Sequence, residues 1–101
     1  MLFLSSEKEL KLNDISLIYF YSHDNIFPIS KRIFSLLNEI ETKLNINILC
    51  IDINYFGNLI KRFNIETTPT FIFFTNAIEA GRITYVPTLF EIEQTIKTLD
   101  I

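Results

Sequence analysis

The chain has 101 residues, of which 49% are hydrophobic, with 9 basic and 12 acidic side chains and a net charge of −3. This length supports one domain over residues 1–101, with a core that needs no disulfide. The acidic balance argues against a nucleic-acid partner, and the single cysteine excludes an intramolecular disulfide and a dithiol redox centre.

The apolar runs are too short for a membrane partner. The longest, at residues 15–21 and 71–74, have the length of strands and cannot cross a bilayer. Residues 1–4 are apolar, but they are shorter than the apolar region of a signal peptide. We therefore expect a protein of the cytoplasm or of a reducing organelle interior.

The first half of the chain alternates strand and helix patterns. Residues 2–4 are predicted to form a short strand, and a capping box formed by Ser6 and Glu9 predicts a short helix ending near residue 12. Residues 15–21 favour a strand that is buried on both faces, as central parallel strands are. A polar break follows, and Pro28 suits the first turn of a long helix that reaches about residue 44.

The second half adds a hairpin and a final helix. Residues 46–53 are predicted to form a strand and residues 55–63 a short helix. Further strands are expected at 70–75 and 82–86, with a turn at 76–81. Thr88 and Glu91 form a second capping box, which opens the last helix. The order βαβαβαββα predicts an α/β fold, a three-layer α/β/α sandwich. Its mixed sheet has three parallel strands and an antiparallel hairpin edge.

Three segments in this order resemble the thioredoxin family. Residues 17–22 are similar to its second strand, residues 49–54 to its third strand with an aspartate, and residues 63–71 to its Thr-Pro-Thr loop. The resemblance covers almost the whole chain and implies the thioredoxin fold. It also implies a cis peptide bond before Pro69, whereas the residues alone require only that Thr68 is extended.

The chain departs from the family at the reactive positions. The Cys-Gly-Pro-Cys motif of thioredoxins falls on residues 25–28 or 26–29, which contain no cysteine or serine. The family's buried carboxylate falls on Tyr19, whose hydroxyl titrates near pH 10. Thiol–disulfide exchange needs an attacking thiolate, so we do not expect that enzyme activity here.

Two single residues have both a chemical and a structural interpretation. Cys50 lies within a predicted strand, where cysteine behaves as a small buried hydrophobe, and we expect it to be inert. His23 lies in the loop after the second strand and is expected to be solvated, because no second histidine or cysteine is available to complete a zinc site. We therefore expect no metal and no cofactor.

In the thioredoxin family a partner protein lies across the groove beside the proline. An apolar patch at this groove, rimmed by Ser22, His23 and Asp24, is typical of a protein-docking site. The alternative is that Ile26 and Phe27 pack inward and cap the end of the sheet. By the resemblance, the groove would be lined by Ile26, Phe27, Pro28, Thr68, Pro69, Val86 and Pro87.

The function predicted from the sequence is a redox-inactive thioredoxin-like domain that binds a protein partner, as an adaptor or as a small subunit of a larger assembly. One alternative is an atypical thiol oxidoreductase that uses Cys50 or a cysteine of its partner. The other is a non-catalytic binder of glutathione-like ligands. The sequence leaves the identity of the partner and the oligomeric state open.

Overall fold

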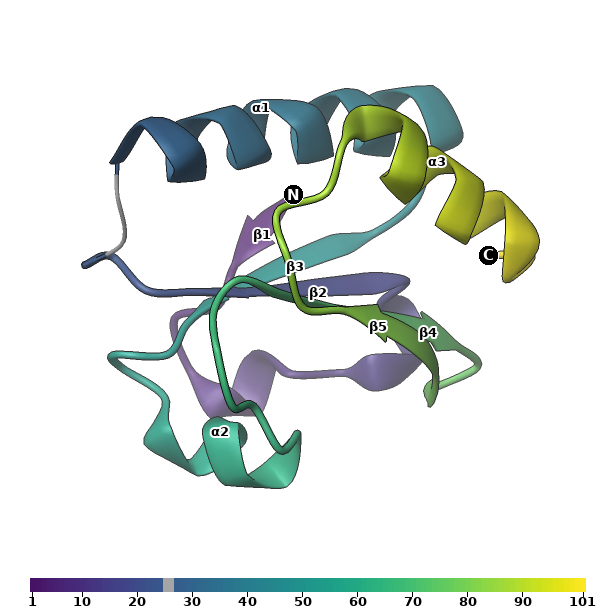
Figure 1. Cartoon of the computed structure of the whole chain (residues 1–101). Coiled ribbons are helices and arrows are strands. Elements are labelled where there is room, and N and C mark those ends of the chain that lie inside the picture. Colours follow the sequence, from purple (N-terminus) through teal and green to yellow (C-terminus); the bar gives the residue numbers. More distant parts are fainter. Residues whose placement is uncertain (25–26) are drawn as a thin grey trace.

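A mixed sheet forms the middle layer of the protein (Figure 1). The computed structural model describes residues 1–24 and 27–101, with side chains from residue 30 onward after that gap. In this part of the chain the sheet has five strands in the order β1-β3-β2-β4-β5. Strands β1, β3 and β2 run parallel, while β4 is antiparallel to β2 and β5 is antiparallel to β4. The strands are β1 (Leu2–Phe3), β2 (Leu17–Tyr21), β3 (Ile48–Asp52), β4 (Thr70–Thr75) and β5 (Ile78–Ile83).

Helices cover both faces of the sheet (Figure 1). The long helix α1 (Phe27–Leu44) and the last helix α3 (Leu89–Thr98) lie on one face. The short helix α2 (Gly57–Arg62) lies on the other face, together with two 3₁₀ helices at Glu7–Glu9 and Leu12–Asp14. The described residues therefore form a three-layer α/β sandwich.

Alternation along β2 divides its side chains between two hydrophobic clusters. Leu17 and Tyr19 pack in the cluster beneath α1 and α3, whereas Ile18 and Phe20 pack in the cluster around α2. All four are fully buried. A strand that is covered on both faces has no polar alternation, which explains the continuous apolar run in the sequence.

Two of the predicted elements are wrong in detail. The first connection contains two 3₁₀ helices in place of one short α-helix, although the predicted capping box at Ser6 is present. The hairpin turn is also shorter than expected, because Asn76 and Ala77 alone make it, with positive φ angles of 52° and 68°. As a result β5 begins at residue 78 and not at 82.

The predicted order of elements is thus only partly matched. What holds is an α/β fold with a mixed five-stranded sheet and three α-helices in the described residues. Antiparallel pairing extends beyond the hairpin, since β4 also pairs antiparallel with β2. No helix in this part of the chain is both long and apolar enough to span a membrane.

Candidate functional site

Four loops converge at one edge of the sheet, by which we mean the end where the last residues of β2 and β3 lie. Tyr21, the last residue of β2, pairs with Asp52, the last residue of β3. Phe20 pairs with Thr70, the first residue of β4, and β5 runs back beside β4. The segments after β2, β3 and β5 and the segment before β4 therefore all leave the sheet at this edge, where α1 also begins (Figure 1).

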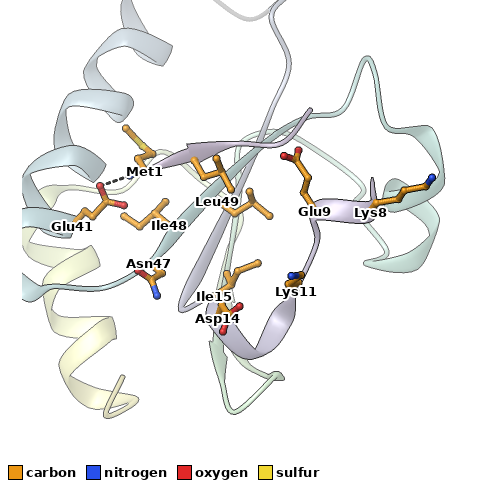
Figure 2. Close-up of a pocket in the computed structure, with 11 residues that line it drawn as sticks. Met1, Lys8, Glu9, Lys11, Asp14, Ile15, Glu41, Asn47, Ile48 and Leu49 are labelled. Atoms are coloured by element: carbon orange, nitrogen blue, oxygen red, sulfur yellow. Dashed lines mark hydrogen bonds and ion pairs between the residues drawn. The ribbon is translucent and has the colours of Figure 1, made fainter. Parts of the chain in front are cut away.

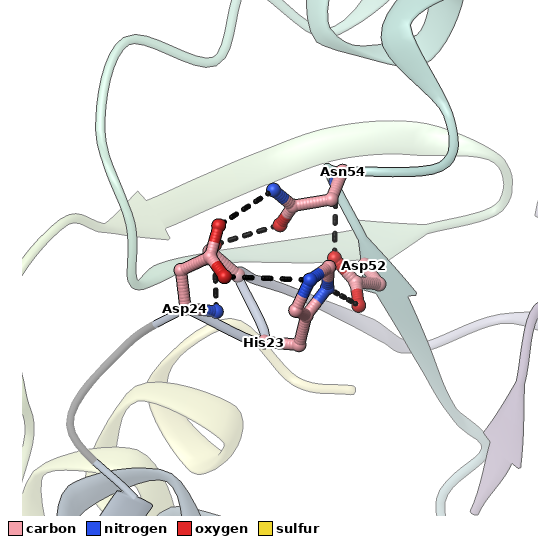
Figure 3. A network of polar contacts seen from close by, with 5 residues as sticks. His23, Asp24, Asp52 and Asn54 are labelled. Atoms are coloured by element: carbon pink, nitrogen blue, oxygen red, sulfur yellow. Dashed lines mark hydrogen bonds and ion pairs between the residues drawn. The ribbon is translucent and has the colours of Figure 1, made fainter.

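A network of hydrogen bonds joins the loops after β2 and β3 (Figure 3). His23 Nδ1 lies 2.9 Å from Asp52 Oδ2, and the backbone N–H of Asn54 donates to Asp52 Oδ1 at 3.0 Å. The Asn54 side chain donates to Asp24 Oδ2 at 3.1 Å and accepts from Ser22 Oγ at 2.7 Å. Because Asn54 bonds to both loops, it fixes their relative position.

His23 is the titratable centre of this network. Its hydrogen bond with Asp52 raises its pKa above the ordinary value of 6.5, and the nearby Asp24 adds to the rise. Asp52 is buried, while the His23 side chain is half exposed and stacks on the ring of Tyr55, with centroids 5.5 Å apart. No group of three metal-ligating side chains among the described residues is able to hold a metal ion.

The structure describes six of the seven residues predicted for the groove at least in part, and four of them with their side chains. The peptide bond between Thr68 and Pro69 is cis, which confirms the expectation from the resemblance. Thr68, Pro69 and Val86 are half-buried, whereas Pro87 is buried.

The other residues predicted for the groove belong to the start of the long helix. Phe27 is the first residue of α1 and Pro28 the second. Ile26 lies outside the described residues. Whether Ile26 and Phe27 point outward or inward therefore stays a prediction.

Two exposed tyrosines near this edge were not foreseen. Tyr55 follows β3 and is 73% exposed, and Tyr85 follows β5 and is 54% exposed. The register pairs Phe71 with Ile83, so Tyr85, two residues after β5, and Pro69, one residue before β4, both lie at this end of the hairpin. The polar network was also missed, although its signal is visible: polar residues follow directly on two neighbouring parallel strands.

Cys50 and Tyr19 are both buried in the core. Cys50 is 1% exposed in β3, and burial raises the pKa of its thiol to about 12. The Tyr19 ring stacks on Phe71 at a centroid distance of 4.8 Å. Burial also raises the pKa of Tyr19, and the neighbouring Ser30 hydroxyl only partly offsets this rise. The burial of Cys50 agrees with its interpretation as a small hydrophobic residue in a strand.

A separate pocket of about 580 Å³ lies at the opposite end of β3 from Asp52 (Figure 2). Charges of both signs line it, including Lys8 and Glu9, and Glu41 forms an ion pair with the ammonium group of Met1. Because the charges are mixed, the pocket favours neither an anionic nor a cationic ligand. None of the groove residues named above lines it.

No family model and no curated protein matches this chain. Solved thioredoxins have a similar structure at low sequence identity. A mutant thioredoxin from Halobacterium salinarum NRC-1 superimposes with a TM-score of 0.85 at 15% identity, covering 97% of this chain and 88% of that one. For oxidised thioredoxin O2 from Arabidopsis thaliana the TM-score is 0.79 at 20% identity, with 97% and 92% covered. For reduced Schistosoma mansoni thioredoxin it is 0.79 at 21% identity, with 97% and 96% covered. These likenesses show a thioredoxin-like fold, here with one cysteine and no Cys-x-x-Cys pair.

Proposed function

We propose that this chain is a redox-inactive thioredoxin-fold domain that binds a protein partner, as an adaptor or as a small subunit of a larger assembly. The binding surface would be the Pro69 groove, which we define as the sheet edge around Pro69 with Tyr55, Tyr85 and the start of α1. The observation that carries the proposal is the exposure of both tyrosines at this edge. Tyrosine is enriched in protein interfaces, because its ring adds contact area and its hydroxyl tolerates water.

The inert thiol supports a binding role over a redox role. A nucleophilic cysteine has to be accessible and ionised, and Cys50 is neither. The alternative of an oxidoreductase that works through Cys50 therefore finds no support in the geometry. Nothing in the described residues favours a glutathione-like ligand over a protein. A reducing compartment, which suits a lone free thiol, belongs to the same proposal.

The expected affinity is modest. Full burial of one large side chain contributes about 1.5–3 kcal/mol, so two tyrosine anchors supply only part of the free energy of a stable complex. Association itself costs several kcal/mol in lost rigid-body freedom. The proposal therefore requires further contacts between the partner and this chain. From the sequence, Phe27 at the start of α1 is the residue predicted to make one of them.

The test is a comparison of proteins captured by immobilised variants in a reducing buffer. We expect the double variant Tyr55→Ala/Tyr85→Ala and the single variant Phe27→Asp to lose a protein that the wild-type chain captures. Ile78→Ala is the matched control, since Ile78 is 70% exposed but lies at the hairpin turn, at the other end of β5. Cys50→Ala should retain the captured protein.

Two results would contradict the proposal. Capture that is equal for the double variant and for Ile78→Ala would show that the Pro69 groove is not the binding surface. Capture that disappears in Cys50→Ala, with the variant folded by circular dichroism, would favour a covalent thiol role. Far-UV spectra of every variant separate loss of binding from loss of structure.

A further inference from the structure

An open cleft of about 540 Å³ runs along one flank of α1, beside the end of β2. Its volume lies within the range of small-molecule sites, roughly 300–1,000 Å³. The residues that define its chemistry are Tyr21 and His23 from the β2 end and Lys31, Phe34, Ser35 and Asn38 from the helix. It contains neither Pro69 nor the two exposed tyrosines of the Pro69 groove, although His23 in its lining stacks on Tyr55, so the two surfaces are distinct but adjoin.

The floor of the cleft is aromatic and held in place by the core. The rings of Tyr21 and Phe34 meet edge to face, with centroids 5.1 Å apart and an interplanar angle of 86°. Phe3 adjoins both rings, at 6.4 Å from Tyr21 and 5.3 Å from Phe34. The buried Tyr19 ring stacks beneath Tyr21 at 5.4 Å. Rings fixed in this way form a preformed surface for a flat apolar group.

The rim of the cleft on the helix side offers unused hydrogen-bond donors. Lys31, Ser35 and Asn38 are spaced four and three residues apart, so they project from one face of α1. All three are exposed, and within the described residues their side chains form no hydrogen bond or ion pair. His23 faces them from the β2 side, with its own charge balanced by Asp52 and Asp24.

The charges of the lining select the sign of a ligand. Among the described residues that line the cleft none is acidic, and the two carboxylates nearest to it, Asp24 and Asp52, are both paired with His23. Lys31 provides a positive charge, and Ser35 and Asn38 provide neutral donors beside it. A carboxylate accepts hydrogen bonds from such groups and leaves its apolar body free to lie on the rings.

We infer that this cleft binds a small-molecule carboxylate with a flat apolar body of one or two rings, whose carboxylate lies between Lys31 and Asn38 and whose rings lie on Tyr21 and Phe34. The site is independent of the protein-binding function proposed above, because the residues that carry the two proposals are different.

The test is a titration with 2-naphthoate, followed by the amide chemical shifts of the full chain, with the neutral 2-naphthamide as the matched ligand. We expect saturable shifts confined to the residues that line the cleft. The amide should bind about five-fold more weakly, since it loses the pairing with an exposed lysine. Equal affinity for acid and amide would overturn the role of charge, and shifts spread over other surfaces would overturn the site.

Two variants on one helix turn complete the test. Lys31→Glu should weaken 2-naphthoate binding by about ten-fold or more, because it replaces an attraction by a repulsion. Arg32→Glu makes the same change of charge at the next residue, which is exposed but does not line the cleft, and should leave affinity within about two-fold. Equal weakening by both variants would mean a non-specific charge effect and would overturn the inference. Protein capture by Lys31→Glu should match the wild type, so failure of the cleft and failure of the Pro69 groove are distinguishable.

Discussion

The only histidine of the chain holds its proton more tightly than a free imidazole, because Asp52 accepts a hydrogen bond from its ring. A group whose pKa is higher in the folded than in the unfolded protein stabilises the fold when it is protonated. The contribution of His23 is therefore fully present below the unfolded value near 6.5 and is lost as the pH rises through the folded pKa. Stability that depends on His23 should thus fall, not rise, toward alkaline pH.

A proton NMR titration of His23 tests this directly, since its ring signals are the only histidine signals. We expect the wild-type pKa to lie above 6.5, and Asp52→Asn to lower it toward that value, because the hydrogen bond to Asp52 is the main cause of the rise. Asp24→Asn should lower the pKa less, since Asp24 lies 3.4 Å from the other ring nitrogen and acts mainly through its charge. An equal or larger effect of Asp24→Asn would show that the pairing in solution differs from the one described.

At the level of single residues, sequence patterns identified what is buried but not what is paired. The interpretation of Cys50 as inert followed from its position in an apolar strand, and its burial agrees. The partner of His23 was missed because Asp52 lies 29 residues further along the chain. Only the parallel register of β2 and β3 brings the two together, and a register between distant strands is not visible in local patterns.

The β4–β5 hairpin has a turn with an unfavourable residue in it. Asn76 and Ala77 both adopt positive φ angles, as the two central residues of a type I′ turn must. Asparagine tolerates this region, whereas for alanine the contact between Cβ and the following carbonyl costs roughly 1–2 kcal/mol. The chain's two glycines lie elsewhere, and Gly81 is in β5, where an added Cβ would come within 3.4 Å of Leu99.

Ala77→Gly should therefore stabilise the protein. We expect the free energy of unfolding to rise by about 0.5–1 kcal/mol, because relief of the strained φ angle exceeds the extra backbone entropy of glycine in the unfolded chain. Urea denaturation followed by circular dichroism measures the difference. Ala80→Gly is the control: Ala80 is exposed in β5 without a positive φ angle, so the change should cost about 0.5–1 kcal/mol. A loss of stability in Ala77→Gly would contradict the turn geometry.

The same hairpin shows why element boundaries were predicted less well than element types. Gly81 was taken to end the turn, since glycine is common in turns, and the second strand was placed too late. In the fold, Gly81 pairs with Phe73 within the sheet, and Leu99, which follows α3, lies close to it, as is typical of a glycine within a strand. By contrast, both capping boxes were correct, because a cap depends only on residues three positions apart.

Taken as a whole, the molecule places its only thiol inside the hydrophobic cluster between the sheet and the α1–α3 layer. Cys50 pairs with Tyr19 in the register of two interior strands of the sheet. Access to the sulfur therefore requires the layers to separate. The α/β class was predictable because apolar periodicity distinguishes strands from helices along the chain, whereas the thioredoxin-like fold was expected from the resemblance of three segments to that family.

Thiol labelling of the native protein should therefore report global unfolding. With a pKa of about 12 the native thiol is ionised far less than an unfolded thiol of pKa about 8.5, which alone slows its reaction roughly a thousand-fold or more. We expect labelling by an aromatic disulfide reagent to be slow in buffer and fast in urea, with one thiol per chain. Cys50→Ala gives the background signal. Rapid labelling without urea would place the thiol at the surface and revive the oxidoreductase alternative.

The stack of Tyr19 on Phe71 has a consequence for protein engineering. Two cysteines introduced into the segment that joins β2 to α1 would restore the letters of a Cys-x-x-Cys motif. By the resemblance, the carboxylate with which thioredoxins move protons falls on Tyr19, whose ring is packed in the core. A reductase built on this scaffold would need the core residue replaced as well, and an aspartate at position 19 would have to be desolvated among the rings that now exclude water. Adding the two cysteines alone would therefore leave the site incomplete.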